Sequence, residues 1–381
     1  MIKFLAALLF CAAAGPARAL ELSPFYGIEQ KRDNNIYLAE TGAQSSWINI
    51  SSAGLSAAHR KDSFTLDASY GIGKISYSKD SSINDYVSHD AALSFGFQPS
   101  SGSFLRVREH YLFTAAPETS EQTQRLKHGE NTAGADLKMP LGGGFGVFAG
   151  AGMLKLSYSD LGAAALNRSD YALRGGLDYE LGPDMRAFVS YERGMIRYDS
   201  ASGCDADYNQ PAAGLDGTLL PGIRLYGEVN MQRRDYKQDK TSGGYSANNK
   251  PQTYGGRFLL AWQANPDTFV RLSVARGNFE STQTLSRYYV STRTELDFTQ
   301  KVQGFIIQAG SGLEFLDSPE VTPATDAKRK TNDFFAGAGL GYELSKACVL
   351  GAAFSSRTRS SNESGLGFAD QIYNFYLKGR F

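Results

Sequence analysis

From Leu20 to the end of the chain, apolar and polar positions alternate with a period of two, and clusters of turn residues interrupt the alternation about every 20 positions. The segments 170–181, 223–232 and 287–298 show the pattern most clearly, with apolar or small residues on one face and polar residues on the other. Successive side chains of a β-strand point to opposite faces of a sheet. The pattern therefore predicts antiparallel strands, most of them about ten residues or longer.

The connections between these strands alternate in length. Short turns are expected at 60–63, 99–103, 141–144, 182–185, 221–222, 264–268, 300–301 and 345–347. Longer polar loops are expected at 31–45, 78–84, 115–124, 159–167, 199–206, 237–251, 281–285, 317–330 and 361–367. Eight short turns interleaved with nine longer loops give about 18 strands, with both chain ends on the short-turn side. This topology predicts an all-β, transmembrane antiparallel up-and-down β-barrel, with short periplasmic turns and longer extracellular loops.

A soluble β-sandwich or propeller would alternate as well. Strands of about five or six residues suffice for a sandwich, whereas a tilted strand needs about 9–11 residues to cross a bilayer. In hydrocarbon every backbone N–H and C=O must be paired, and a closed barrel is the sheet that achieves this. The length of the alternating segments therefore favours the barrel.

Two places fit the pattern poorly. Glu109 falls in an apolar series that runs from Leu105 to Phe113 and is expected to face lipid. A charge at mid-depth costs on the order of a few kcal/mol, so we expect either a bulge that changes the register or a neighbour that satisfies the carboxylate. Within 302–312, the consecutive apolar residues Phe305, Ile306 and Ile307 leave the register open.

Residues 1–19 have the layout of a cleaved signal peptide: Lys3, an apolar run from Phe4 to Ala14, and the sequence Ala17-Arg18-Ala19. Phe10, directly before Cys11, disfavours a lipoprotein site. The remainder, 20–381, is expected to form a single domain because no linker or composition break divides it. The sequence thus predicts a barrel exported to the outer membrane.

Composition agrees with a barrel, since 41 Gly, 21 Tyr and 23 Phe stand against 2 Trp and 12 Pro. After residue 19 there is no run of about 18 apolar residues that could form a transmembrane helix. Lys+Arg and Asp+Glu balance at 39 each, so nucleic acid is not expected as a partner. Cys204 and Cys348 are expected at opposite ends of the barrel, too far apart for a disulfide.

The last alternating segment ends the chain on an aromatic residue. One face of this segment carries Tyr373, Phe375, Leu377 and Phe381. It resembles the terminal strand of bacterial outer-membrane proteins, in which the final Phe is part of what the barrel-assembly machinery recognises. The resemblance implies this machinery and the lipid of the outer membrane as partners.

A second resemblance lies in the N-terminal third. Pro24, the segment Asp33-Asn34-Asn35-Ile36-Tyr37, the segment 64–71 and Asn84-Asp85-Tyr86 are similar to the β-barrel porin 2 family, and after residue 115 the similarity is one of spacing. Members of that family are inferred outer-membrane barrels, some encoded beside polysaccharide secretion systems. The resemblance implies a porin-like role without naming a solute.

No residue pattern predicts catalysis. The four histidines, at 59, 89, 110 and 128, are isolated and form no close metal pair. No G-x-S-x-G motif is present in the sequence. We therefore expect no enzyme activity, no metal and no cofactor, although a barrel hydrolase that assembles Ser, His and an acid across strands stays an alternative.

The polar face is expected to line a water-filled bore, with arginine as its leading charge. Its candidate pore-lining residues are Asp67, Arg106, Arg108, Arg174, Asp178, Arg224, Glu228, Arg257, Arg271, Arg287, Arg293, Glu295, Asp297, Lys378 and Arg380. Rows of arginine favour anions or hydroxyl-rich sugars. The alternative for any one residue is a cross-strand pair with a carboxylate that stiffens the wall. Gly337, Gly339 and Gly341 lie on the same face, where they would widen the bore, admit a folded-in loop or allow a close backbone contact.

Eighteen tilted strands enclose a barrel roughly 35 Å across, which leaves a bore of about 20–25 Å after side chains are subtracted. Wall side chains alone do not fill such a bore, so water or folded-in loops must occupy it. The prediction is a porin-like channel for passive passage or export of hydrophilic solutes, polysaccharide among them. The alternative is a non-conducting barrel for surface display or adhesion, with loops 237–251 and 317–330 as its working parts.

Overall fold

The computed structural model describes residues 20–100, 102–200, 204–238, 240, 248–283, 286–322 and 327–381. The predicted signal peptide, 1–19, lies outside the described residues, as do parts of the predicted loops 199–206, 237–251, 281–285 and 317–330. None of the helices among the described residues is both long enough and apolar enough to cross a membrane.

The described chain is almost entirely β-structure. Its strands are β1 (Leu20–Asp33), β2 (Ser46–Lys61), β3 (Phe64–Tyr77), β4 (Tyr86–Phe97), β5 (Phe104–Thr114), β6 (His128–Gly142), β7 (Phe145–Tyr158), β8 (Arg168–Gly182), β9 (Met185–Tyr198), β10 (Ala206–Leu220), β11 (Ile223–Tyr236), β12 (Gln252–Asn265), β13 (Thr268–Glu280), β14 (Tyr288–Val302), β15 (Phe305–Thr322), β16 (Ala327–Ser345), β17 (Cys348–Ser361) and β18 (Phe368–Arg380). Two short helices, α2 (Ser81–Asn84) and η1 (Leu161–Leu166), lie in connections.

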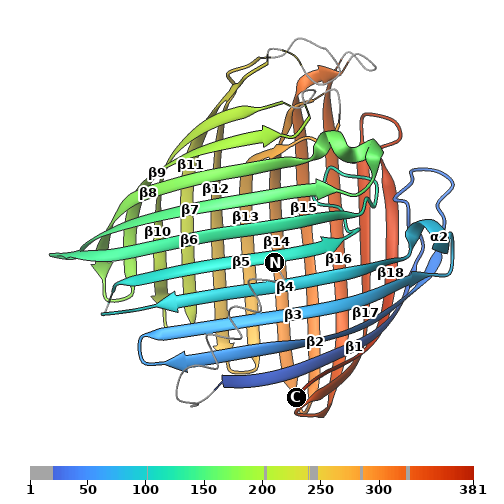
Figure 1. Cartoon of the computed structure of the whole chain (residues 1–381), viewed down its shortest axis with the longest axis horizontal. Helices are drawn as coiled ribbons and strands as arrows, with labels where there is room; N and C mark the ends of the chain where they lie inside the picture. The colour runs from blue at the N-terminus through green and yellow to red at the C-terminus, as the bar shows by residue number, and fades with distance from the viewer. Residues whose placement is uncertain are drawn as a thin grey trace.

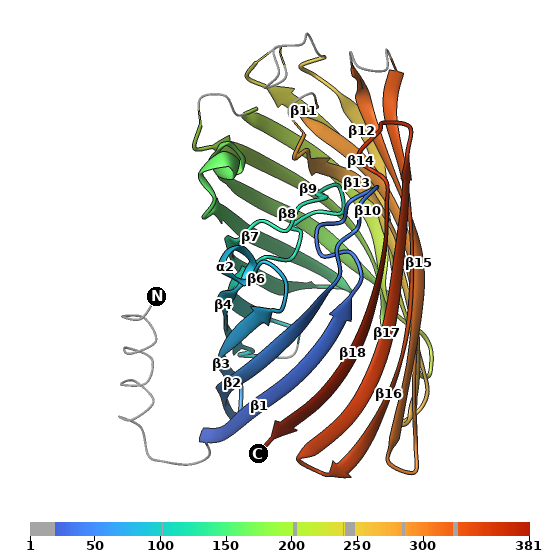
Figure 2. The same ribbon diagram turned by 90° about the vertical axis from the view of Figure 1, so that its right-hand side faces the viewer.

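All 18 strands described form one antiparallel sheet in which each strand pairs with its neighbours in the sequence. The sheet closes because β1 pairs with β18 as well as with β2, from Phe25 opposite Arg380 to Asp33 opposite Ile372. Figures 1 and 2 show the strands following one another round the wall, with β1 beside β18 and the C-terminus near the start of β1. The predicted closed barrel, its strand number and the placement of both ends are confirmed.

The short turns fall where the sequence predicts them, with one exception. The prediction of a turn at 300–301 is wrong, because β14 continues to Val302 and the turn is formed by Gln303 and Gly304, with φ of 49° and 81°. A two-residue hairpin needs positive φ at these positions, which glycine adopts without strain. The turn also settles the register that the sequence left open, since Phe305 and Ile307 are exposed on the outer face and Ile306 is not.

The prediction of a long loop at 317–330 is wrong as well. Strand β15 runs to Thr322 and β16 begins at Ala327, with a break in the regular register between Asp317 and Val321. The polar residues of this segment predict a loop, but outside the hydrocarbon a hairpin needs no apolar face to remain paired. Here the inward polar side chains are buried in contacts with one another, as Arg329 with Ser318 at 2.7 Å. The two strands therefore project beyond their neighbours.

Apolar side chains cover the outer face of the barrel. Leu173 of β8 is 65% exposed and Val229 of β11 is 69% exposed, while polar residues alternate with them on the inner face. A soluble protein rarely leaves such large side chains uncovered over a whole wall. In a closed sheet the backbone N–H and C=O groups of every strand are paired with a neighbouring strand, so a sheet with this apolar outer face is stable in hydrocarbon.

Glu109 keeps its place in the outward series. The pairings of β5 with β4 and with β6 continue without a register shift on both sides of Glu109, so no bulge turns it inward. The Nδ2 atom of Asn131 lies 3.5 Å from its Oε1 atom. Of the two expected solutions, the neighbouring polar side chain is the one present.

Cys204 lies in the long connection after β9, and Cys348 begins β17 beside a short turn. The two cysteines are therefore at opposite ends of the barrel, and no disulfide joins them.

Several aromatic rings of the inner face lie flat on glycines of the adjacent strand. The rings of Phe148 and Tyr376 cover Gly176 and Gly351, where a Cβ atom would overlap them. A ring that lies against the wall does not extend into the bore, and it shields the backbone that the glycine leaves bare. The inner face of β16 also carries glycines, which have no side chains to extend into the bore: Gly337, Gly339 and Gly341.

We expect Gly351→Ala to destabilise the barrel by about 1–3 kcal/mol, because the added methyl group must displace the ring of Tyr376 from the wall. Urea-induced unfolding of the folded barrel measures the effect. Gly339→Ala is the matched control, since its Cβ would meet only ordinary contacts with Ala353 and Ala352, at 3.4 and 3.6 Å. Equal losses for the two variants would contradict the role assigned to the ring.

Candidate functional site

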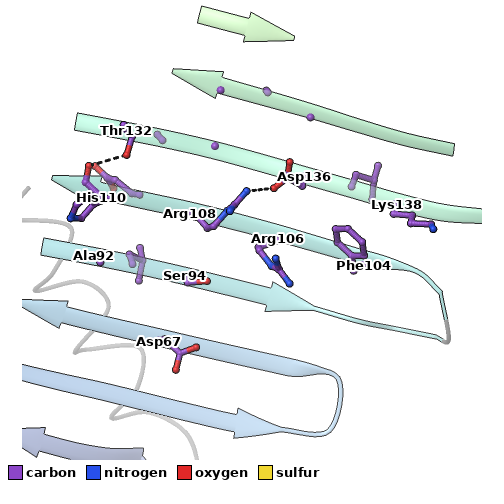
Figure 3. Close-up of a pocket in the computed structure, with 18 of the residues that line it drawn as sticks. Asp67, Ala92, Ser94, Phe104, Arg106, Arg108, His110, Thr132, Asp136 and Lys138 are labelled. Atoms are coloured by element: carbon purple, nitrogen blue, oxygen red, sulfur yellow. Dashed lines mark hydrogen bonds and ion pairs between the residues drawn. The ribbon is translucent and has the colours of Figure 1, made fainter. Parts of the chain in front are cut away.

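A cavity of about 1030 Å³ occupies the lumen along the wall formed by β2 to β11. Five of the predicted pore-lining residues lie on it: Asp67, Arg106, Arg108, Arg174 and Arg380. Figure 3 shows Arg106, Arg108 and His110 along β5, facing the same space as Asp136 and Lys138 of β6 and Asp67 of β3. Charged side chains therefore reach the cavity from several strands, between small and apolar residues such as Ala92 and Phe148.

Most charged residues of the inner face are paired with a neighbour. Arg108 binds Asp136, and Arg271 binds Asp297 at 2.8 Å. The other predicted pore-lining residues in such pairs are Asp67 with Arg60, Asp178 with Lys138, Arg224 with Asp216, Arg293 with Glu295, and Lys378 with Glu29. All of these pairs except Asp178 with Lys138 are partly open to the lumen, so each of them contributes little to stability. Asp178 is 3% exposed and therefore does not face open water as predicted. The open pairs do offer both signs of charge to a solute in the bore.

Three arginines of the inner face have no carboxylate partner among the described residues. Arg106 lies over the ring of Phe104, with 5.7 Å between its guanidinium carbon and the ring centroid. Arg380 donates to the hydroxyl of Ser56 at 3.0 Å, and Arg257 stands opposite Glu228 in the strand pairing without an ion pair. Unneutralised guanidinium groups in a water-filled bore favour anionic or hydroxyl-rich solutes.

At mid-height, Arg174 of β8 reaches along the inner wall to β11. Its Nη2 atom donates to Oε2 of Glu228 at 2.8 Å, and Tyr226 donates to the same oxygen at 2.7 Å. The guanidinium lies 5.8 and 5.6 Å from the ring centroids of Phe148 and Phe188. The bridge spans three strand intervals, so it holds β8 to β11 as one stiff section of the wall.

The segment 115–127, between β5 and β6, crosses the bore. The hydroxyl of Ser120 donates to Oε1 of Glu314 on β15 at 2.7 Å, and the guanidinium of Arg359 on β17 donates to the carbonyl oxygen of Ser120. In the ring of 18 strands β6, to which the segment leads, and β15 stand nine places apart, which is half of the circumference. The segment that the sequence placed in an outer loop at 115–124 therefore folds into the lumen and reaches the opposite wall.

Buried ion pairs anchor this crossing segment at both ends. Glu118 accepts from Arg168 of β8 at 2.6 Å, and Arg125 donates to Asp33 of β1 at 2.7 Å. On the far wall Glu121, which is 5% exposed, pairs with Arg329 of β16. A single buried carboxylate without a partner would be costly, so each of these pairs fixes the path of the segment.

Glu121 also joins the crossing segment to the connection between β13 and β14. Its carboxylate accepts from the hydroxyl of Ser281 at 2.9 Å and from the backbone N–H of Thr282 at 2.6 Å. The two connections therefore meet inside the barrel and narrow it together.

The ends of β13 and β14 close the lumen further against β9 to β11. Glu280 pairs with Arg234 and accepts from the hydroxyl of Tyr198 at 3.1 Å, and the rings of Tyr236 and Tyr288 stack with 6.0 Å between centroids. Tyr288 and Val290 belong to the apolar face of the predicted segment 287–298, which the barrel prediction turns towards lipid. That placement is wrong for these two residues, because both are buried in this cluster with Ile196 and Ala206.

Arg287 corrects the predicted pore lining. It precedes β14 and is 1% exposed, so it does not face open water. Its Nε atom donates to Oε1 of Glu320 at 2.9 Å, its Nη1 atom donates to the carbonyl oxygen of Gln238, and its guanidinium lies 4.2 Å from the ring centroid of Tyr236. The alternating pattern predicts Arg287 on the polar face of a strand. In the structure it instead joins the connection between β13 and β14 to the connection between β11 and β12 and to the end of β15.

The predicted assembly residues lie on the outer face of β18. Tyr373, Phe375 and Phe381 are exposed there, and Phe381 stacks on Tyr26 of β1 with 5.9 Å between centroids. Within the described ranges, no three His, Cys, Asp or Glu side chains converge in a group that could hold a metal ion.

No family model matches the chain, and no curated protein sequence does. Among solved structures, OccK2 (OpdF) of Pseudomonas aeruginosa matches with a TM-score of 0.51 and 12% identity over 95% of this chain and 97% of that one. OccAB4 of Acinetobacter baumannii matches with a TM-score of 0.49 and 12% identity over 96% and 100% of the two chains.

The closed ring of strands, its apolar outer face and its polar lumen define a bacterial outer-membrane β-barrel. The fold is shared with OccK2 (OpdF), to which the chain is similar over 95% of its length.

Proposed function

We propose that the protein is a porin-like channel through which hydrophilic solutes cross the outer membrane passively. The observation that carries the proposal is a cavity of about 1030 Å³ within a closed barrel, which charged side chains reach from several strands. The crossing segment 115–127 sets the size of solute that passes, because it narrows the bore on the side of the longer connections.

For the solute, we propose hydroxyl-rich or anionic molecules, and polysaccharide among them. The arginines without carboxylate partners, Arg106, Arg257 and Arg380, support this choice, since a guanidinium donates several hydrogen bonds at once. The resemblance of the N-terminal third to the β-barrel porin 2 family, some of whose members are encoded beside polysaccharide secretion systems, supports it further.

Planar-bilayer recording tests the proposal. The purified chain is expected to insert and give discrete current steps in KCl, and neutral oligosaccharides small enough to enter the bore are expected to reduce the current reversibly. A barrel that serves display or adhesion gives no steps at any voltage. A barrel hydrolase would release product from lipid or peptide substrates and lose that activity when one histidine is replaced by alanine.

We expect Arg106→Glu to shift the ion selectivity of the channel towards cations, because it replaces a positive charge in the cavity by a negative one. The reversal potential in a KCl gradient measures the shift. Lys74→Glu changes charge by the same amount on the outer face of β3 and is expected to leave the reversal potential unchanged. Equal shifts for both variants would show that Arg106 does not face the conducting path.

A further inference from the structure

Three polar residues lie side by side on the outer face of β9, β10 and β11. Arg193 is paired with Asn209, and Asn209 is paired in turn with Arg233. Strands are about 4.8 Å apart, so the two arginines emerge roughly 10 Å from each other with the amide between them. Side chains at paired positions of a sheet point to the same side. The three residues therefore form one cluster, here called the outer arginine cluster.

The neighbours of the cluster show that it faces outward. Tyr191 and Met195, two residues before and after Arg193, are 52% and 40% exposed. The intervening Glu192 accepts from the hydroxyl of Tyr208 on the inner face, and Arg234 is buried against Glu280. The cluster is thus on the opposite side of the wall from the lumen and takes no part in the conducting path.

The hydrogen-bond donors of the cluster lie on its outward side, away from the rest of the protein. The hydroxyl of Tyr191 donates to Oδ1 of Asn209 at 2.7 Å, which leaves the Nδ2 donors of that amide on the outer side. Arg193 and Arg233 are exposed and have no carboxylate partner among the described residues. Two guanidinium groups and one amide thus present donors alone, which suits a multiply charged oxygen anion.

The cluster lies where the apolar outer face ends. In the same row of the sheet Leu173 of β8 is 65% exposed, and towards the short turns Val189 and Val229 are largely exposed as well. Towards the longer connections the outer face becomes charged, since Arg197 and Lys237 share the carboxylate of Asp207. The cluster is therefore at the border between hydrocarbon and headgroups on the extracellular side.

We propose that the outer arginine cluster binds the phosphate group of a lipid headgroup in the extracellular leaflet. An arginine side chain binds phosphate oxygens with paired donors, and basic residues at a membrane surface attract anionic lipid. Lys155 of β7, exposed on the same outer face, adds positive charge nearby.

A second copy of the chain would have to bring a carboxylate to the same place. The outer-face carboxylates that neighbour the cluster, Asp207 and Asp235, lie on its side towards the longer connections, and Asp207 is already paired with Arg197 and Lys237. On its side towards the short turns the outer face carries apolar side chains such as Val189 and Val229.

Native mass spectrometry of the folded full-length barrel in neutral detergent tests the proposal. The probes are lipid A, which carries phosphate on a glycolipid, and phosphatidylcholine at the same concentration. Lipid A is expected to remain bound and to be retained less at high salt, because screening weakens charge attraction. The double variant Arg193→Gln/Arg233→Gln is expected to bind lipid A with an affinity lower by on the order of tenfold.

Lys74→Gln/Lys330→Gln is the matched control, because it removes the same charge from exposed positions of β3 and β16. It is expected to retain lipid A as the unaltered chain does. All variants must migrate as folded barrels on unheated gels and keep the conductance of the unaltered channel. Equal retention of lipid A by both double variants, equal retention of the two lipids, displacement by inorganic phosphate alone, or a dimer that dissociates in the arginine variant would overturn the proposal.

Discussion

Replacement of residues 117–124 by a short glycine-serine linker is expected to raise the single-channel conductance several-fold. The bore of an 18-stranded barrel is about 20–25 Å wide after side chains are subtracted, and the crossing segment spans it from β5 to β15. Its removal also deletes Glu121, which holds the connection between β13 and β14 inward through Ser281 and Thr282. The replacement therefore removes the crossing segment from the bore and also releases the connection between β13 and β14.

Deletion of Ser364 and Gly365 is the control, since these residues are exposed in the connection between β17 and β18. The conductance of that variant should match the unaltered channel in planar bilayers. An unchanged conductance after replacement of 117–124 would show that the segment does not obstruct the path of ions.

Arg234→Met is expected to lower the free energy of unfolding by about 3–5 kcal/mol, because it leaves the carboxylate of Glu280 buried without its charged partner. The double variant Arg234→Met/Glu280→Leu should recover much of that loss, since two apolar side chains can fill the space of a buried pair. Urea-induced unfolding of the folded barrel measures both, and the coupling between the two positions follows from the cycle.

Arg271→Met provides the comparison. The side chains of Arg271 and Asp297 remain 47% and 41% exposed, so loss of this pair should cost at most about 1 kcal/mol. Comparable losses for Arg234→Met and Arg271→Met would contradict the burial of the cluster that closes the lumen.

Most of the fold can be predicted from the period-two pattern of apolar and polar residues. The outward face of β18, from Tyr373 to Phe381, can be read directly from the sequence because lipid and water impose opposite demands on alternate residues. The turn after β14 was misplaced because Gln300 and Lys301 are polar, although Gly304 marks the position that needs positive φ. The polar residues of 317–330 also led to a predicted loop where β15 and β16 continue, since strands outside the hydrocarbon need no apolar face.

The crossing segment could not be predicted in this way. Ser120 contacts Glu314 across 194 positions of the chain, and Arg359 reaches the carbonyl oxygen of Ser120 across 239 positions. Contacts between residues so far apart in the chain leave no periodic pattern in the sequence. The charged residues of 115–127 are also typical of a solvated loop, so they do not indicate that the segment enters the lumen. Arg287 shows the same limit, because only the partners it meets in the fold distinguish a buried anchor from a pore-lining residue.

The central claim is that residues 115–127 cross the lumen of a closed barrel and attach to its far wall. Cysteines introduced by Ser120→Cys and Glu314→Cys, in a chain with Cys204→Ser and Cys348→Ser, test it most directly, because the hydroxyl of Ser120 and the carboxylate of Glu314 are 2.7 Å apart. A cysteine at 314 is shorter than the native glutamate, so a short bifunctional thiol reagent, which can bridge the gap that a disulfide cannot, should cross-link the two cysteines in the folded barrel in high yield. The pair Ser120→Cys/Phe315→Cys, in which the second cysteine faces outward, should cross-link far less. Failure of the first pair to cross-link, or equal cross-linking of both pairs, would contradict the account.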